Sequence, residues 1–209
     1  LQDKFAMVGS LYYLLMSPGY YVQNGMQPEM MTVPEMARDY KYKDAQSYMG
    51  NAYTRLAPLF KGTKFTERFD LNKLSGQDRQ IAKELEDRSV INSTISAELG
   101  SFVDGTPTEG MKAKVKRFDT ALRELPNKLE QINRVSSGIA AYKLARDKGN
   151  LSHQKAIDYA EQVIVNSHGD YSELNAPSFL STQQSPLPTR VLFQFRKFQL
   201  IQIGYMAKM

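Results

Sequence analysis

Few side chains in this sequence have the types and spacing that catalysis or metal binding requires. The chain contains two histidines, His153 and His168, and no cysteine. Without cysteine there can be neither a disulfide framework nor a thiolate metal site, and two histidines leave little for a histidine metal site or a Ser-His triad. Both histidines fall at the ends of a predicted helix, where we expect them to act as caps. The sequence therefore predicts no catalytic residue, no cofactor-binding residue and no metal ligand.

Cationic side chains are concentrated in the second half of the chain. Residues 1–110 carry 12 basic and 14 acidic side chains, whereas residues 111–209 carry 15 basic and 8 acidic ones. A basic half can meet nucleic acid, anionic lipid or an acidic protein surface. The candidate contacts to phosphate or lipid headgroups are Lys112, Lys114, Lys116, Arg117, Arg190 and Lys197. The alternative for the run from Lys112 to Arg117 is the solvated face of an amphipathic helix.

Four further polar residues lie beside predicted apolar stripes, namely Asn24, Glu98, Asn133 and Arg134. Polar side chains in such positions bridge or cap helices more often than they catalyse, so we expect them to be buried anchors.

The elements that position these residues are predicted to be helices. Thr32-Val33-Pro34-Glu35 has capping-box spacing and is expected to open a helix that runs to about Phe60, with an interruption near Gly50 or Pro58. No segment alternates apolar and polar residues as a strand does. We therefore predict an all-α fold, a set of amphipathic helices in an irregular bundle that ends in a cationic apolar helix.

Three further helices follow from caps and apolar periodicity. Ser75 is expected to cap a charged helix that ends at about Arg88. Thr106-Pro107-Thr108-Glu109 is expected to open the next helix, which Pro126 should end before the chain restarts. The restarted helix should end at Gly149 and should bury a stripe of Leu129, Ile132, Val135, Ile139 and Tyr142. Ser152 is then expected to cap a helix that ends at Gly169.

These features divide the chain into five predicted segments. They are an N-terminal helical segment (1–60), a connector with short helices (61–106), a helical bundle core (107–169), an extended linker (170–188) and a terminal amphipathic helix (189–209). Within the first segment, residues 5–28 carry no charge and have the length of a membrane span. Pro18 and Gly19 interrupt this stretch, so we expect two short packed helices rather than one spanning helix.

The terminal segment is apolar around most of its predicted circumference. One side carries Val191, Phe195, Phe198, Tyr205 and Met206, and Arg190 and Lys197 lie roughly opposite. One interpretation is a core helix buried on two sides. The other is a helix that contacts a membrane or a partner, with its cations toward lipid headgroups.

Three stretches, in order, resemble a known group of proteins. Residues 10–28 (SLYYLLMSPGYYVQNGMQP) contain an Asn-x-x-Gln-Pro pattern. Residues 129–177 contain Glu130, Asn133 and Arg134, and later Asn175-Ala176-Pro177. Residues 194–198 read QFRKF. Together they resemble the C-terminal-side region of the large internal virion (ejection) proteins of short-tailed bacteriophages.

The resemblance implies a delivery role without a reaction in this region. Such proteins are packaged in the capsid, leave through the portal and tail, and help to build a conduit for DNA across the bacterial envelope. The resemblance therefore implies a homo-oligomer with other virion proteins as partners, located in the virion and then in the host envelope. The alternative is a nucleic-acid-binding helical accessory module of a phage polymerase or antirestriction polyprotein.

Overall fold

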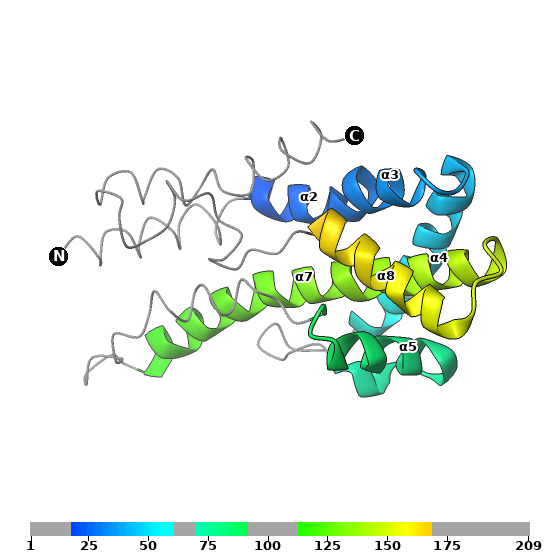
Figure 1. Ribbon diagram of the computed structural model, residues 1–209. Helices are drawn as coiled ribbons and strands as arrows, with labels where there is room; N and C mark the ends of the chain where they lie inside the picture. The colour runs from blue at the N-terminus through cyan, green and yellow to red at the C-terminus, as the bar shows by residue number, and fades with distance from the viewer. Residues whose placement is uncertain (1–17, 61–69, 92–112, 169–209) are drawn as a thin grey trace, which may run out of the picture.

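The computed structural model describes residues 18–60, 70–91 and 113–168, and within these ranges most residues lie in helices (Figure 1). No strand occurs within these three ranges. The predicted all-α fold class is therefore confirmed.

The helical elements follow one another closely along the described ranges. In chain order they are α2 (Pro18–Gln27), the π-helix η2 (Pro28–Thr32), α3 (Val33–Met36), α4 (Tyr42–Phe60), the 3₁₀-helix η3 (Leu71–Lys73), α5 (Gly76–Asp87), α7 (Ala113–Asp147) and α8 (His153–His168).

Helix α7 is the element against which α2, η2, α4, α5 and α8 pack (Figure 1). Its second half is buried on most sides, and it contributes Val135, Ile139 and Leu144 to a hydrophobic core. The same core takes side chains from α3, α4, α5 and α8, including Met36, Met49, Leu56, Ile81, Leu85, Ile157 and Ile164. Side chains from the predicted segments 1–60, 61–106 and 107–169 thus share one core.

The predicted helix ends are largely confirmed on either side of the α7–α8 turn. Of the predicted apolar stripe, Ile132, Val135, Ile139 and Tyr142 are buried and Leu129 is half-buried. Helix α7 ends two residues before Gly149, and α8 begins directly after Ser152. Ser75 precedes α5 as predicted, and that helix ends at Asp87.

The predicted capping box at Thr32 is wrong. The chain is already helical before Thr32, through α2 and η2, and Thr32 has helical backbone angles (φ −73°, ψ −42°) with no side-chain capping bond. A helix N-cap needs a non-helical backbone, so this residue cannot serve as one. Its hydroxyl is instead used in contacts between helices, described below.

The predicted interruption of the next helix near Gly50 or Pro58 is also wrong, since α4 is continuous through both. The break lies earlier, at residues 37–41, between α3 and α4. This turn places the Tyr40 ring edge-on against Tyr159 of α8, with ring centroids 5.6 Å apart. Burial of Met49, Ala52 and Leu56 holds α4 together across Gly50.

Pro126 does not restart the chain, because α7 runs without a break from Ala113 to Asp147. Proline removes one backbone N–H donor from the helix, but the neighbouring residues keep their own hydrogen bonds. The packing of the second half of α7 fixes the path of the helix. The proposed cap at Thr106–Glu109 lies outside the described residues. Within the described ranges, no helix is both long enough and apolar enough to cross a membrane.

Candidate functional site: a polar core between the helices

The most unusual feature of the described core is its number of buried polar side chains. They are Asn24, Gln27, Thr32, Glu35, Lys128, Glu130, Asn133, Arg134, Ser136, Ser137, Ser167 and His168. The predicted burial of Asn24, Asn133 and Arg134 is confirmed, whereas Glu98 lies outside the described residues. Buried polar groups are costly unless they are hydrogen-bonded, so their partners determine what this core can do.

Asn133 links three helices through both atoms of its amide. Its Nδ2 donates to the backbone oxygen of Asn24 in α2 at 2.7 Å, and its Oδ1 accepts from the Tyr53 hydroxyl of α4 at 2.6 Å. Burial raises the pKa of Tyr53 to about 12, so this hydroxyl remains a donor at neutral pH. We call Asn24, Tyr53 and Asn133, together with Pro28, the Asn133 joint.

Pro28 explains why the Asn133 joint is needed. In a regular α-helix the carbonyl of Asn24 would accept the N–H of residue 28, four positions later, but proline has no N–H. The chain passes here into the π-helix η2, in which the N–H of Val33 donates to the Pro28 oxygen five residues earlier. The Asn133 amide supplies a donor to the carbonyl that Pro28 cannot serve.

One turn of α7 beside this joint carries a buried ion pair. The Nε and Nη2 atoms of Arg134 donate to Glu130 Oε1 at 3.0 and 2.8 Å, and its Nη1 donates to the Val90 oxygen at 3.1 Å. Val90 lies in the turn after α5, so this arginine ties that turn to α7. Removing either partner would deprive a buried charge of its ion pair, which is destabilising.

The second part of the polar core is a set of hydroxyls around one imidazole, which we call the His168 cluster. His168 Nε2 lies 2.9 Å from the Ser137 Oγ and 3.3 Å from the Thr32 Oγ1. Thr32 Oγ1 also lies 2.9 Å from the Ser137 Oγ and donates to the Ser167 Oγ at 3.1 Å. Ser167 in turn donates to the Val163 oxygen at 2.6 Å. The cluster joins η2, α7 and α8.

His168 therefore joins helices and does not act as the helix cap that we predicted. It is 1% exposed, and burial, with a smaller effect of the Arg134 charge, holds its pKa well below the ordinary value of 6.5. The Ser137–His168 distance is one that a nucleophile and its base would have. Because both side chains are buried, no substrate can reach them unless the helices separate, so the arrangement acts as a contact between helices.

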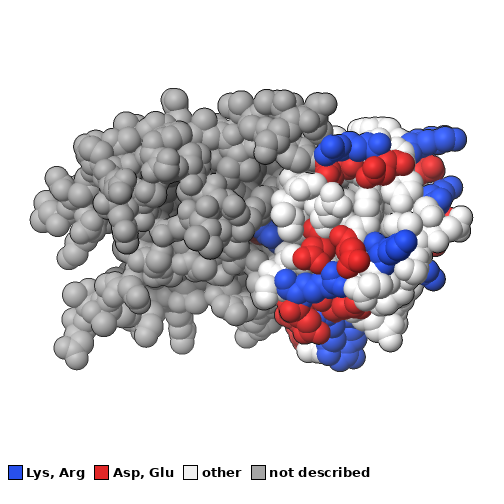
Figure 2. Space-filling model, in the orientation of Figure 1, with Lys and Arg blue, Asp and Glu red and all other residues white. Residues whose placement is uncertain are grey.

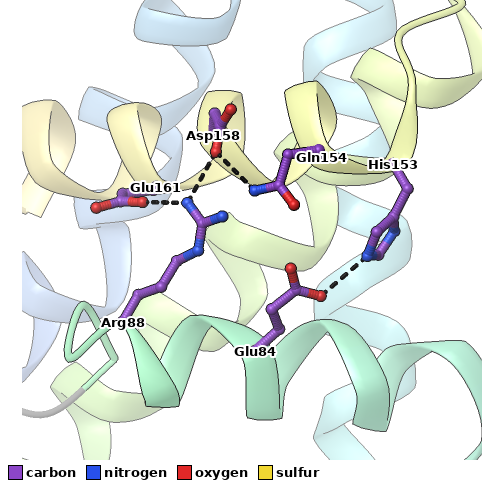
Figure 3. A network of polar contacts seen from close by, with 6 residues as sticks. All are labelled: Glu84, Arg88, His153, Gln154, Asp158 and Glu161. Carbon is purple, nitrogen blue, oxygen red and sulfur yellow. Dashed lines mark hydrogen bonds and ion pairs between the residues drawn. The ribbon is translucent and has the colours of Figure 1, made fainter.

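His153 also joins helices instead of capping one. Its Nε2 lies 2.9 Å from Glu84 of α5, and its Nδ1 lies 2.8 Å from the Tyr142 hydroxyl of α7. Figure 3 shows His153 and Glu84 facing each other across the gap between α8 and α5. No local pattern predicts this contact, since the three residues lie on three different helices.

Beside His153, Arg88 extends the same surface network. Arg88, directly after α5, reaches Asp158 at 2.9 Å and Glu161 at 2.5 Å on α8 (Figure 3). The hydrogen bonds to Glu161 and then Asp158 raise the pKa of the Arg88 guanidinium. The Arg88 bond, followed by that of Gln154, lowers the pKa of the Asp158 carboxyl. Surface ion pairs of this kind add little to stability, so their main effect is to orient α5 on α8.

Most of the predicted contact residues cannot be placed at this site. Val191, Phe195, Phe198, Tyr205, Met206, Arg190, Lys197 and Lys112 lie outside the described residues. Lys114, Lys116 and Arg117 belong to α7, ahead of the part whose side chains are described. On the described face in Figure 2, basic and acidic side chains alternate and no patch of a single sign is visible. No group of three His, Asp or Glu side chains in the described ranges could hold a metal ion.

An exposed apolar stripe, which the sequence analysis did not single out, lies on α2 and η2. Val22, Met26 and Met30, spaced four residues apart, are 62%, 51% and 56% exposed. Four-residue spacing puts them on one helix face. Exposed Gly25 lies on the same helix, with open space where a side chain would be. We call these three side chains the α2 stripe.

Comparison of the chain with protein-family models, with curated proteins and with solved structures finds no match.

Proposed function

We propose that this chain is part of a structural and delivery protein of a bacteriophage particle, an internal virion (ejection) protein that self-associates and helps to form the conduit for viral DNA across the host envelope. Its partners are further copies of itself and other virion proteins of the portal, tail or core. It also contacts viral DNA without reading sequence and meets the host membrane. It is carried in the virion and passes to the host envelope after ejection.

The observation that supports this proposal best is the meeting of the residues on which the family resemblance depends. Asn24, Gln27 and Pro28 come from the first resembling stretch, and Glu130, Asn133 and Arg134 come from the second, more than 100 positions later. All six are buried, and Asn133 donates to the carbonyl that Pro28 leaves without its usual donor. A chance likeness of two short motifs would give no reason for Asn133 of one to bond to Asn24 of the other.

The α2 stripe supports self-association. Exposed apolar side chains in a row mark contact surfaces more often than isolated ones do. The stripe carries no cation, so it lacks the charge that attracts an anionic lipid surface. A second copy of the chain fits better, because α2 has no charged residue that would oppose its own copy.

The direct test is mass spectrometry of purified phage particles. We expect peptides of this sequence within a virion polypeptide much longer than 209 residues. Detection of the protein in infected cells, together with its absence from the particles, would contradict the proposal.

Membrane contact is tested separately, at the terminal segment. The 209-residue chain should sediment with vesicles of anionic phospholipid, and Phe195→Ser with Phe198→Ser should abolish this. Met26→Ser with Met30→Ser is the control, since the α2 stripe is assigned to protein contact and its loss should leave sedimentation unchanged. Equal sedimentation of the wild type and the phenylalanine variant would remove the membrane role from residues 189–209.

The nucleic-acid-binding alternative makes a different prediction. Retention on duplex DNA should then fall steeply with salt and should be lost when Lys112, Lys114, Lys116 and Arg117 are neutralised. Such retention, together with absence from virions, would favour the accessory module over the delivery protein.

A further inference from the structure

The His168 cluster holds the last turn of α8 against two other elements. Thr32 ends η2, Ser137 lies in the buried half of α7, and Ser167 and His168 end α8. Thr32 and Ser137 are separated by 105 positions, and Thr32 and His168 by 136. The contact is therefore tertiary, and the end of α8 depends on it.

A protonated imidazole does not fit this environment. Imidazolium carries two N–H donors and needs two acceptors. His168 Nε2 faces the Ser137 and Thr32 hydroxyls, but Nδ1 is buried and has no hydrogen-bond partner among the described residues. A proton added at His168 would leave one buried N–H donor of a charged ring without an acceptor. Leaving a charged group unsatisfied in this way costs more free energy than leaving a neutral group unsatisfied at the same place.

The charged groups around the cluster do not compensate for such a proton. Arg134, from α7, adds a positive charge that opposes it. Glu35, from α3, is negative, but it is held by Asn166 of α8 at 2.6 Å and by Arg38 at 3.2 Å. Glu29, from η2, is exposed and accepts from Gln46 of α4. Arg134 is itself paired with Glu130 of α7, and the carboxylates of Glu35 and Glu29 also have partners of their own.

We propose that the His168 cluster is a pH-sensitive contact, in which protonation of His168 releases the last turn of α8 from η2 and α7. The direction follows from the lowered pKa of His168 in the folded state. The unfolded chain binds this proton at about pH 6.5 and the folded chain does not. The stabilisation is therefore complete above pH 6.5 and is lost as the pH falls. This inference does not depend on the proposed delivery function.

The experiment uses the whole chain, whose two histidines make a matched pair. Urea unfolding is followed by circular dichroism at pH 7.5 and 5.5, where ordinary carboxylates stay ionised. For the wild type we expect the unfolding constant to rise about tenfold between these pH values, the effect of one proton bound only by the unfolded state. His153→Gln should keep this rise. His168→Gln, which retains a polar atom near the Nε2 position, should lose it.

Hydrogen exchange at the two pH values, corrected for the intrinsic pH dependence of the rate, separates local release from global unfolding. We expect protection to fall at pH 5.5 at residues 163–168 and 30–34 before it falls in the buried half of α7. If His168→Gln does not fold, the wild type and His153→Gln still decide the outcome. A pH-independent unfolding constant in both, or equal loss of protection in every helix, would overturn the proposal.

Discussion

At the scale of single residues, the polar core depends on one side chain that replaces a hydrogen-bond donor missing at another residue. Pro28 deprives the Asn24 carbonyl of its usual donor, and Asn133 supplies one from a different helix. Asn133 is fully buried, so neither its amide nor that carbonyl can turn to water. An unsatisfied buried group costs about 1–3 kcal/mol, more than the net gain from a hydrogen bond.

This pairing predicts a coupling between two distant positions. Asn133→Ala should lower the free energy of unfolding by about 2–4 kcal/mol, because the Asn24 carbonyl and the Tyr53 hydroxyl each lose a buried hydrogen bond. In a Pro28→Ala background the restored N–H can serve the carbonyl, so the same substitution should cost about 1 kcal/mol less. Urea unfolding of the four proteins in a double-mutant cycle measures the difference. Additive effects would show that Asn133 does not serve the carbonyl left by Pro28.

At the scale of elements, the helix ends are set by residues that the sequence patterns did not indicate. After α5, Ser89 adopts a left-handed conformation (φ 63°), and the N–H groups of Ser89 and Val90 donate to the oxygens of Glu86 and Leu85. After α7 the left-handed residue is Asn150 (φ 50°) and not the predicted terminator, Gly149. Serine tolerates this conformation less well than asparagine or glycine.

The two left-handed positions give a matched prediction. Ser89→Gly should raise the free energy of unfolding by about 1 kcal/mol, because glycine removes the strain of the left-handed backbone. Asn150→Gly should change it by less, since asparagine already tolerates the position. Thermal unfolding of both variants measures the effects. A larger gain at Asn150 than at Ser89 would contradict this account of the helix ends.

Gly149 is required for a different reason, which is the close approach of the α7–α8 turn to Tyr40. An added Cβ would collide with the Tyr40 hydroxyl and lie 2.7 Å from the Ala145 oxygen. Gly149→Ala should therefore destabilise the protein by about 1–3 kcal/mol. Gly50, at an exposed position of α4, has open space around the added carbon, so Gly50→Ala should stabilise by about 0.5–1 kcal/mol. Urea unfolding of both variants checks this contrast, and a stabilising Gly149→Ala would show that the turn can move away.

At the scale of the whole molecule, the α2 stripe predicts concentration-dependent assembly. Met26→Ser with Met30→Ser should shift sedimentation velocity profiles toward monomer while leaving the unfolding free energy nearly unchanged, because both side chains are more than half exposed. Val165→Ser on α8, where the side chain is 42% exposed, is the matched control and should leave association as in the wild type. Unchanged association in the methionine variant would remove the stripe from the interface.

Across the whole molecule, the features that depend on neighbouring residues were predictable and those that depend on distant residues were not. Helices α5 and α8, the buried stripe on α7 and the burial of Asn24, Asn133 and Arg134 were predictable, because caps and apolar periodicity are local signals. The use of Thr32 in the His168 cluster was not, because its partners lie more than 100 positions away. The continuity of α7 through Pro126 was missed because proline is a strong local breaker whose effect packing overrode.

The Asn133 joint has a consequence for how reliably the helices find their places. The buried face of α7 is rich in small residues, with Ser136, Ser137, Ala140, Ala141 and Ala145 in succession, and such a smooth surface offers little resistance to sliding by one turn, about 5.4 Å. A slip of that size would bring Leu129 or Ser137 into the place of Asn133, and neither has an amide that joins the Asn24 oxygen to the Tyr53 hydroxyl. The Asn133 amide thus disfavours registers of α7 against α2 that apolar packing alone would allow. A chain that has been unfolded would therefore refold to the same register.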